Sequence, residues 1–303
     1  METILKPTAI KFDYFNLYDF IEKIKLHDYV IEHANYSKES LDIYMNKLTK
    51  LNCKAIDYFL IHCFYEEIKD SNLIEHHLIY PEEVLNGDYY MDNLNISHKR
   101  IKDLHDFAER STGEYEYRSI DAWVRLLKND IQTIYWYGAK PEDIQKFMND
   151  FIKIYKDKSI FGDNILLKCT LIHMLFLRIH PFKDGNGRTT RLISDMKFTE
   201  LSNRMYGTKL SIAPLHLSHS LYVNRSEYYK RMDVLYFGLE HDGNDEINRL
   251  FDFMLNMCDE QLYYMENKLD HSSTALYNAV MLEESGIEKD EVIKRLKLEN
   301  TSN

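Results

Sequence analysis

The chain has 303 residues, of which 45% are hydrophobic, and its 49 acidic and 38 basic side chains give a net charge of −11. This length and apolar content permit one large domain or two small ones with a sizeable core. The negative charge argues against a nucleic-acid partner. No stretch approaches the roughly eighteen apolar residues of a membrane span, so we expect no membrane partner.

The cysteines predict a protein of a reducing compartment. They are widely separated and form no C-x-x-C pair, which indicates free thiols rather than a disulfide framework or a zinc site. The first residues, 1–11, lack the apolar run of a signal peptide. We therefore expect a cytoplasmic protein. The four thiols are those of Cys53, Cys63, Cys169 and Cys258.

Long segments of helical periodicity and few glycines or prolines predict an all-α fold. Residues 164–179 are almost continuously apolar, so we expect this helix at the centre of the domain. Two β-prone runs, 123–127 and 131–136, flank the turn at 128–130 and predict one small β-hairpin. The other helices are expected at 12–34, 38–51, 53–75, 97–110, 141–155, 188–203, 224–236, 244–268 and 272–298.

The most informative segment begins at His180 and reads HPFKDGNGRTTR. Pro181 lacks an N–H and disfavours helical geometry at the residue before it, so the preceding helix should end at His180. The turn 184–187 can aim backbone N–H groups at an anion. The helix that begins near Gly187 favours negative charge at its N-terminus. The backbone of this segment therefore predicts a phosphate site.

The polar side chains of the same segment fit a triphosphate and a reacting hydroxyl. Arg188 and Arg191 share a helix face and can hold two phosphates. Asp184 is a hard oxygen ligand suited to Mg²⁺, which usually bridges a carboxylate and substrate phosphates. His180 can accept a proton from an incoming hydroxyl.

This segment resembles the signature of the Fic family, H-P-F-x-[DE]-G-N-G-R-x-x-R, at every specified position. The resemblance implies a mostly helical Fic-like core over residues 98–260, preceded by a helical region at 1–97 and followed by a helical extension at 261–303. The predicted hairpin falls where the family carries a flap that binds target peptides by strand addition. Its target-binding residues would be Ile131, Gln132 and Thr133.

The activity implied by the resemblance is transfer of AMP from ATP, with Mg²⁺ at Asp184, to a Ser, Thr or Tyr hydroxyl of a target protein and of the chain itself. His180 would be the catalytic base, and Phe182 would anchor the loop. Lys183 occupies the variable position of the signature and receives no separate role. The ATP-binding residues would be Lys183, Asp184, Gly185, Asn186, Gly187, Arg188 and Arg191, with Asn224 and Tyr229 near the adenine and ribose.

A second segment, SNLIEH at 71–76, resembles the inhibitory-helix motif [ST]-x-x-x-E-[GN] of the family and departs from it at His76. Its position upstream of the core is that of the N-terminally inhibited class. Ser71 and Glu75 would be the inhibitory residues, with the Glu75 carboxylate paired to Arg191 in place of the γ-phosphate. Residues 113–118 resemble the G-x-[YF]-R element of the family, with two extra residues before Arg118.

Other functions remain open from the sequence. Glu75 could orient water to remove AMP from modified proteins, or the chain could be a non-catalytic adaptor that senses ATP. Phosphate transfer, as in the related Doc toxins, is disfavoured by the intact Gly187. Transfer of another nucleotide or of phosphocholine is compatible with the motif, as is a homo-oligomer. His216 and His219 are expected to be solvated loop residues, because they lack a carboxylate at metal spacing.

Overall fold

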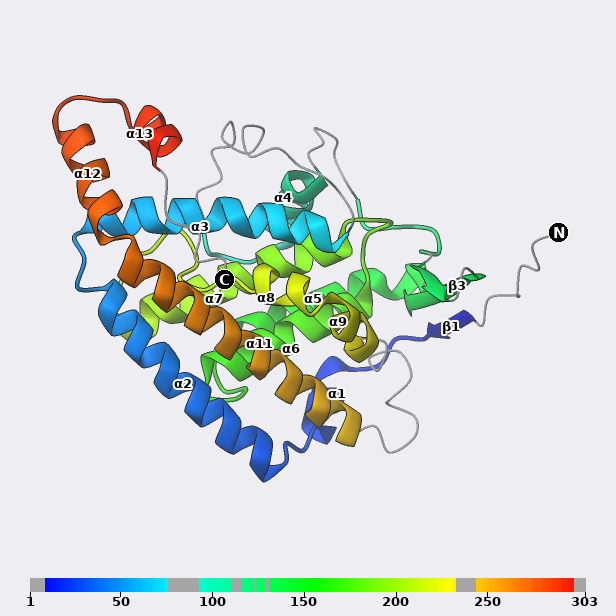
Figure 1. Cartoon of the computed structure of the whole chain (residues 1–303). Coiled ribbons are helices and arrows are strands. Elements are labelled where there is room, and N and C mark those ends of the chain that lie inside the picture. The colour runs from blue at the N-terminus through cyan, green and yellow to red at the C-terminus, as the bar shows by residue number, and fades with distance from the viewer. Residues whose placement is uncertain are drawn as a thin grey trace.

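The computed structural model describes residues 9–75, 93–109, 116–122, 124–128, 131–232 and 244–296. Over these ranges the fold is helical apart from one small sheet, which confirms the predicted class (Figure 1). The elements are β1 (Ala9–Phe12), α1 (Leu17–Lys23), α2 (Asp28–Leu48), α3 (Cys53–Ile74), α4 (His98–Glu109), β2 (Val124–Lys128), β3 (Ile131–Ala139), the 3-10 turn η2 (Pro141–Asp143), α5 (Ile144–Lys156), α6 (Ile165–Ile179), α7 (Asn186–Tyr206), α8 (Ser218–Val223), α9 (Arg225–Met232), α11 (Asn244–His271), α12 (Ser273–Glu284) and α13 (Lys289–Arg295).

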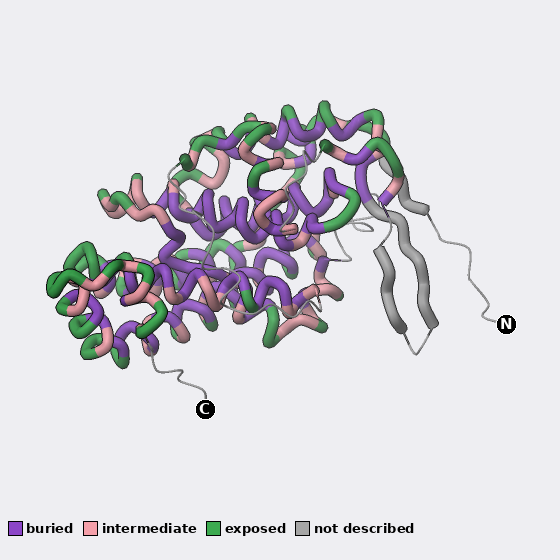
Figure 2. Tube along the Cα trace, turned by 90° about the horizontal axis from the view of Figure 1, so that it is seen from above, coloured by how far each residue is buried: buried purple, intermediate pink, exposed green. Residues whose placement is uncertain are grey.

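Helix α6 is the centre of the fold. Each of its side chains is buried, as the continuous apolar run predicted. Buried residues are concentrated in the interior of the molecule (Figure 2). Helix α6 begins after Asn164, whose side-chain oxygen accepts a hydrogen bond from the backbone N–H of Leu167 at 3.1 Å. The helices α2, α5, α7 and α11 pack around it. No helix within the described ranges is long and apolar enough to cross a membrane.

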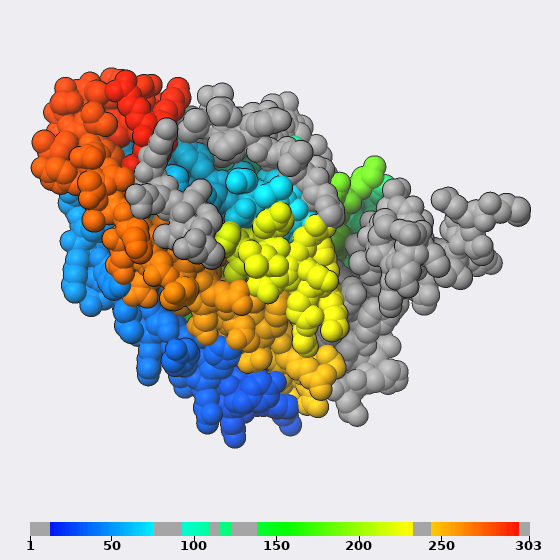
Figure 3. Space-filling view, in the orientation of Figure 1, coloured from blue at the N-terminus to red at the C-terminus, as the bar shows by residue number. Residues whose placement is uncertain are grey.

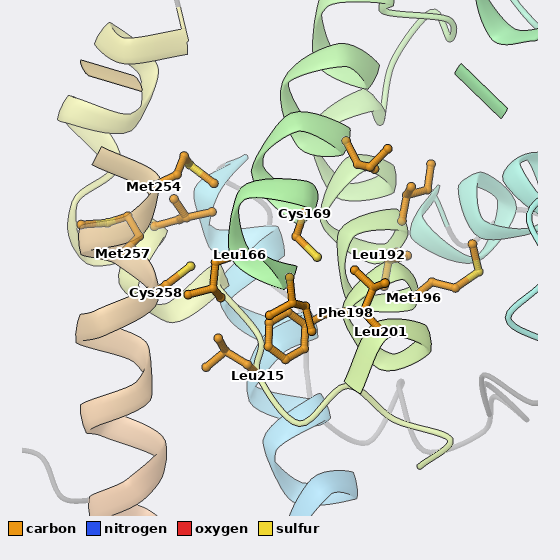
Figure 4. Close-up of a cluster of buried hydrophobic side chains, with 14 of the residues drawn as sticks. Leu166, Cys169, Leu192, Met196, Phe198, Leu201, Leu215, Met254, Met257 and Cys258 are labelled. Carbon is orange, nitrogen blue, oxygen red and sulfur yellow. The ribbon is translucent and has the colours of Figure 1, made fainter. Parts of the chain in front are cut away.

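One part of the core joins α6 and α7 to α11. Side chains of these three helices converge with Leu215, which lies in the connection between α7 and α8 (Figure 4). Burial of an aliphatic or aromatic side chain of this kind contributes about 1.5–3 kcal/mol. This packing fixes the relative position of α6 and α7, the two helices that flank the segment beginning at His180. The labelled residues are Leu166, Cys169, Leu192, Met196, Phe198, Leu201, Leu215, Met254, Met257 and Cys258.

The sheet has three strands in the order β1-β3-β2. The strands β2 and β3 are antiparallel, with Val124 opposite Tyr135 and Lys128 opposite Ile131, which confirms the predicted hairpin. We call β2 and β3 the flap. The strand β1 pairs in parallel with β3, from Ala9 opposite Trp136 onward. It was not predicted, because four residues are too few for strand periodicity to be visible in sequence.

The helical segment expected at 12–34 is two helices. The first, α1, begins after Asn16, whose side chain accepts from the N–H of Tyr18 at 2.9 Å. It ends before Lys25, and the N–H of this residue donates to Asn244 of α11 at 2.9 Å. Helix α2 then continues through 34–38, where a break was expected. The break is set by a distant helix, which local periodicity does not reveal.

Two further boundaries differ from expectation. The helix expected at 272–298 is divided into α12 and α13, with Gly286 in the connection at φ 95°. A glycine adopts this positive φ readily because it has no Cβ atom to cause a steric clash. The short helix α8 was not predicted, because its six residues are fewer than helical periodicity requires.

Candidate active site

His180 directly follows α6 and has a left-handed backbone, φ 53° and ψ 61°. Its N–H still donates to the carbonyl of Phe176 at 3.0 Å, and Pro181 prevents further helix. The side chain is partly buried, with Nδ1 3.3 Å from the carbonyl oxygen of Leu177. Because a carbonyl only accepts, Nδ1 carries the proton and Nε2 has the free lone pair.

The surroundings of His180 keep its imidazole neutral. Burial, followed by the positive charge of Arg118, lowers the pKa of His180 to about 4, although Glu75 and Asp184 act in the opposite direction. At neutral pH the ring is therefore unprotonated and able to accept a proton. The base assigned from sequence has the protonation state that this role requires.

The turn after His180 is closed by its own side chains. The amide of Asn186 accepts from the N–H of Phe182 at 2.9 Å and donates to the carbonyl of Phe182 at 2.8 Å. The buried Phe182 ring stacks on His105 with centroids 3.8 Å apart. The Nε2 atom of His105 bonds to the carbonyl oxygen of Asp184 at 3.0 Å.

In this turn the side chains stabilise the loop, and the backbone N–H groups are left to bind an anion. The side chain of Asn186 is occupied within the loop, so its direct contribution to an anion would come from its backbone N–H. Gly185 has φ 71°, which allows the sharp entry into α7. The first N–H groups of a helix have no partners within that helix. The start of α7 is therefore the place where backbone donors can meet a phosphate.

Asp184 and Lys183 are both exposed at the outer side of the turn. One oxygen of the Asp184 carboxylate accepts from the N–H of Gly185 at 2.7 Å. A single exposed carboxylate fits Mg²⁺, which is held by one or two carboxylates with phosphates and waters. No group of three or more histidines, cysteines, aspartates or glutamates forms a metal cage among the described residues. A bound Mg²⁺ would thus depend on the phosphates of its substrate.

Arg191 is buried against the end of α3. Its Nε donates to the Ser71 hydroxyl at 2.7 Å, and its Nη2 donates to the Ser71 carbonyl at 2.8 Å and to Glu75 Oε1 at 3.0 Å. The same Glu75 oxygen would lie only 2.4 Å from a Cβ atom at Gly187. The structure thus brings Ser71 and Glu75 to the arginine with which Glu75 was predicted to pair, above the start of α7.

Arg188 also forms an ion pair with a carboxylate, that of Glu109, which was not predicted. Its Nη2 lies 2.7 Å from Oε1 of Glu109, the last residue of α4. Both side chains are largely buried, and burial raises the pKa of Glu109 although Arg188 opposes that shift. A Cβ atom at Gly185 would clash with the same oxygen. Glu109 therefore covers the turn on one side, as Glu75 covers it on the other.

Tyr229 joins α9 to the end of α3. Its hydroxyl donates to the carbonyl of Ile74 at 3.0 Å and lies 3.4 Å from Oε2 of Glu75. The end of α3 lies against the α8–α9 segment on one face of the molecule (Figure 3). Asn224 instead bonds through its amide to Ser220 at 3.0 Å and to Glu260 at 2.8 Å. Tyr229 is thus linked directly to Glu75, whereas these bonds tie Asn224 to α8 and α11.

Helix α3 is also fixed to α8. Buried Glu67 accepts from the N–H of Ser218 at 2.9 Å, and Asp70 lies 3.0 Å from Nδ1 of His219. His216 is buried, with Nδ1 3.0 Å from Asp195, so its assignment to a solvated loop was wrong. The carboxylates that surround these histidines lie on α3 and α7, distant in sequence.

The predicted flap ends beside the base. A Cβ atom at Gly138 of β3 would lie 3.0 Å from Cβ of His180 and 2.9 Å from Nη2 of Arg118. Ile131, Gln132 and Thr133 form the first part of β3, opposite Lys128, Leu127 and Leu126. Their contact with a target stays a prediction. His76 and Gly113 lie outside the described residues.

Residues 95–196 match the Fic/DOC family model. The fold is similar to a Fic family protein from Desulfovibrio desulfuricans G20, with a TM-score of 0.58 and 16% identity over 89% of this chain and 88% of that chain. It is also similar to Fic-1 from C. elegans, with a TM-score of 0.50 and 15% identity over 79% of this chain and 74% of that chain.

At these identities the solved structures establish the fold alone, and the family match is limited to residues 95–196. The matched range includes His180, the signature turn, both arginines and Glu109. Ser71, Glu75, Asn224 and Tyr229 lie outside it. The chain therefore carries a Fic/DOC family domain over residues 95–196, and members of this family are typically transferases that move AMP or a related nucleotide group.

Proposed function

We propose that this chain is a protein adenylyltransferase that moves AMP from ATP to a Ser, Thr or Tyr hydroxyl, and that Glu75 inhibits it. The observation that carries the proposal is the position of Glu75. Its carboxylate bonds to Arg191 at 3.0 Å and covers Gly187 at the start of α7. A neutral His180 lies at the other end of the same turn.

In the proposed reaction, Nε2 of His180 accepts the proton of the target hydroxyl. The hydroxyl oxygen forms a bond to the α-phosphorus of ATP, and the bond from that phosphorus to the bridging oxygen of pyrophosphate breaks. The N–H groups at the start of α7 would hold the α-phosphate, and Arg188 and Arg191 would hold the β- and γ-phosphates. Mg²⁺ on Asp184 would neutralise phosphate charge.

Glu75 would inhibit by occupying the place of the γ-phosphate. The guanidinium of Arg191 is already engaged by Ser71 and Glu75, so a triphosphate would have to bind with its γ-phosphate displaced. A misplacement of about 1 Å at the reacting atoms can reduce the rate on the order of a hundredfold. Replacing Glu75 by Gly should restore the aligned position.

The test is intact-protein and peptide mass spectrometry after incubation with Mg²⁺ and ATP. We expect an AMP adduct in Glu75→Gly, less in wild type and none in Glu75→Gly/His180→Ala. Glu32→Gly, on the exposed face of α2, controls for a glycine placed in a helix. Equal adduct in wild type and Glu75→Gly would contradict inhibition by Glu75.

Two other results would redirect the proposal. Loss of AMP from a pre-modified protein that depends on Glu75 would assign the chain to AMP removal, with Glu75 as the residue that orients water. ATP binding without transfer in Glu75→Gly, for the chain itself and for added candidate targets, would support an ATP-sensing adaptor. A different nucleotide or phosphocholine donor is tested by repeating the incubation with that donor.

A further inference from the structure

Arg118 connects the base to the flap through backbone carbonyl groups. Its Nε donates to the carbonyl of His180 at 2.7 Å, and its Nη2 donates to the carbonyl of Ala139, the last residue of β3, at 2.6 Å. Nη1 donates to Ile120 at 3.1 Å, and the N–H of Arg118 donates to Pro181 at 2.9 Å. With 5% exposure, this guanidinium is almost fully enclosed.

The hydrogen bond from Arg118 stabilises an unfavourable backbone conformation at His180. A left-handed conformation is unfavourable for a residue with a side chain. The carbonyl of His180 lies beyond the end of α6, where the helix provides no N–H to meet it. A charge-assisted hydrogen bond from Arg118 satisfies that carbonyl and holds the peptide that carries the base.

The flap approaches the same point closely. Gly138 has φ 127°, and a Cβ atom there would lie 2.9 Å from Nη2 of Arg118 and 3.0 Å from Cβ of His180. A glycine is thus required for β3 to pass so near both residues. The end of β3, the guanidinium and the base form one packed unit.

Arg118 also affects the charge of His180. Of the charged groups that face the imidazole, Arg118 disfavours its protonation, whereas Glu75 and Asp184 favour it. Burial lowers the pKa of Arg118 to about 10, although the negative charge of Asp121 acts in the opposite direction. Arg118 remains a cation at neutral pH.

We propose that Arg118 is a positioning residue that locks the His180 backbone to the end of β3, so that a target strand bound on the flap is placed in register with the base. This inference rests on the proposed function of His180. Arg118 acts through the carbonyl groups of His180 and Ala139, which it joins.

Two variants separate its geometric and electrostatic effects, both made in the Glu75→Gly background. Arg118→Lys keeps the charge but loses the planar fork that reaches several carbonyls at once. We expect kcat to fall about 10- to 100-fold with KM for ATP within about twofold, because the carbonyl groups that Arg118 binds position the base and the flap rather than the predicted phosphate ligands. Arg178→Lys is the matched control, since this buried arginine of α6 packs on the Phe15 and Phe20 rings.

Arg118→Gln removes the charge and should raise the His180 pKa above that of its Glu75→Gly parent, because the cation of Arg118 disfavours protonation of the imidazole. Histidine NMR titration measures this shift without any need for activity, and the signal is assigned by its loss in His180→Ala. Unchanged kcat in Arg118→Lys, or an unchanged His180 titration in folded Arg118→Gln, would overturn the proposal. Absence of transfer in Glu75→Gly itself would instead reject the proposed function and leave the titration to test Arg118.

Thermal unfolding monitored by circular dichroism checks that each variant is folded. If the substitutions at Arg118 prevent folding, Gly138→Ala provides the second route, because its added methyl displaces the guanidinium without removing it. That variant should reproduce the loss of kcat. Full activity of folded Gly138→Ala would contradict the locked arrangement.

Discussion

Removal of the Tyr229 hydroxyl should weaken inhibition by Glu75. This hydroxyl bonds to the carbonyl of Ile74 at 3.0 Å and lies 3.4 Å from the Glu75 carboxylate. Tyr229→Phe keeps the ring and its packing but loses a hydrogen bond of about 0.5–1.5 kcal/mol net. If Glu75 covers the turn in nearly all molecules, the uncovered fraction and the rate of AMP transfer should rise about two- to twelvefold.

The assay is the initial rate of AMP incorporation for wild type, Tyr229→Phe, Glu75→Gly and the double variant. The increase should be present in the wild-type background and absent in Glu75→Gly, because the hydroxyl then has no inhibitory carboxylate to support. Tyr222→Phe, on the exposed side of α8, is the matched control. Equal rates for wild type and Tyr229→Phe, or the same increase in both backgrounds, would refute this reasoning.

Three further outcomes are expected. In Glu75→Gly, kcat/KM should decline with falling pH only around an apparent pKa of about 4 or below, because protonated His180 cannot accept a proton and the substitution removes a carboxylate that favours its protonation; an acid limb near the ordinary value of 6.5 would contradict this. Glu109→Gln should lower the Kd for ATP several-fold in equilibrium titration, because Arg188 no longer exchanges a carboxylate for phosphate, and weaker binding would disprove that competition. Phe182→Ala should reduce the free energy of unfolding in urea by about 3–5 kcal/mol, and a loss below about 1 kcal/mol would exclude its anchoring role.

The parts of the site that sequence predicted correctly are local in the chain. The end of α6 at His180, the turn and the start of α7 follow from Pro181, the glycines and the apolar run before them. The hairpin follows from two β-prone runs separated by a short turn. Each feature depends on residues within a few positions of one another, so local propensity and steric rules suffice.

The missed features depend on contacts between distant segments. The strand β1 exists through pairing with β3, and the break before α2 is stabilised by Asn244. His216 is buried because α7 and α3 supply its polar surroundings. Sequence periodicity reports which face of a segment is apolar, but not which distant carboxylate will meet a given side chain.

Protein partners for Arg188 and Arg191 are predictable from physical chemistry alone. A buried guanidinium needs a carboxylate or several hydrogen-bond acceptors, because an unpaired buried charge is strongly destabilising. Without a triphosphate, both Arg188 and Arg191 must therefore have protein partners, and the structure supplies Glu109 and Glu75. The motif predicts that such partners exist, and a family resemblance identified one of them. The other had to come from tertiary structure, and its place beside Gly185 makes it the second carboxylate that an incoming triphosphate is expected to meet.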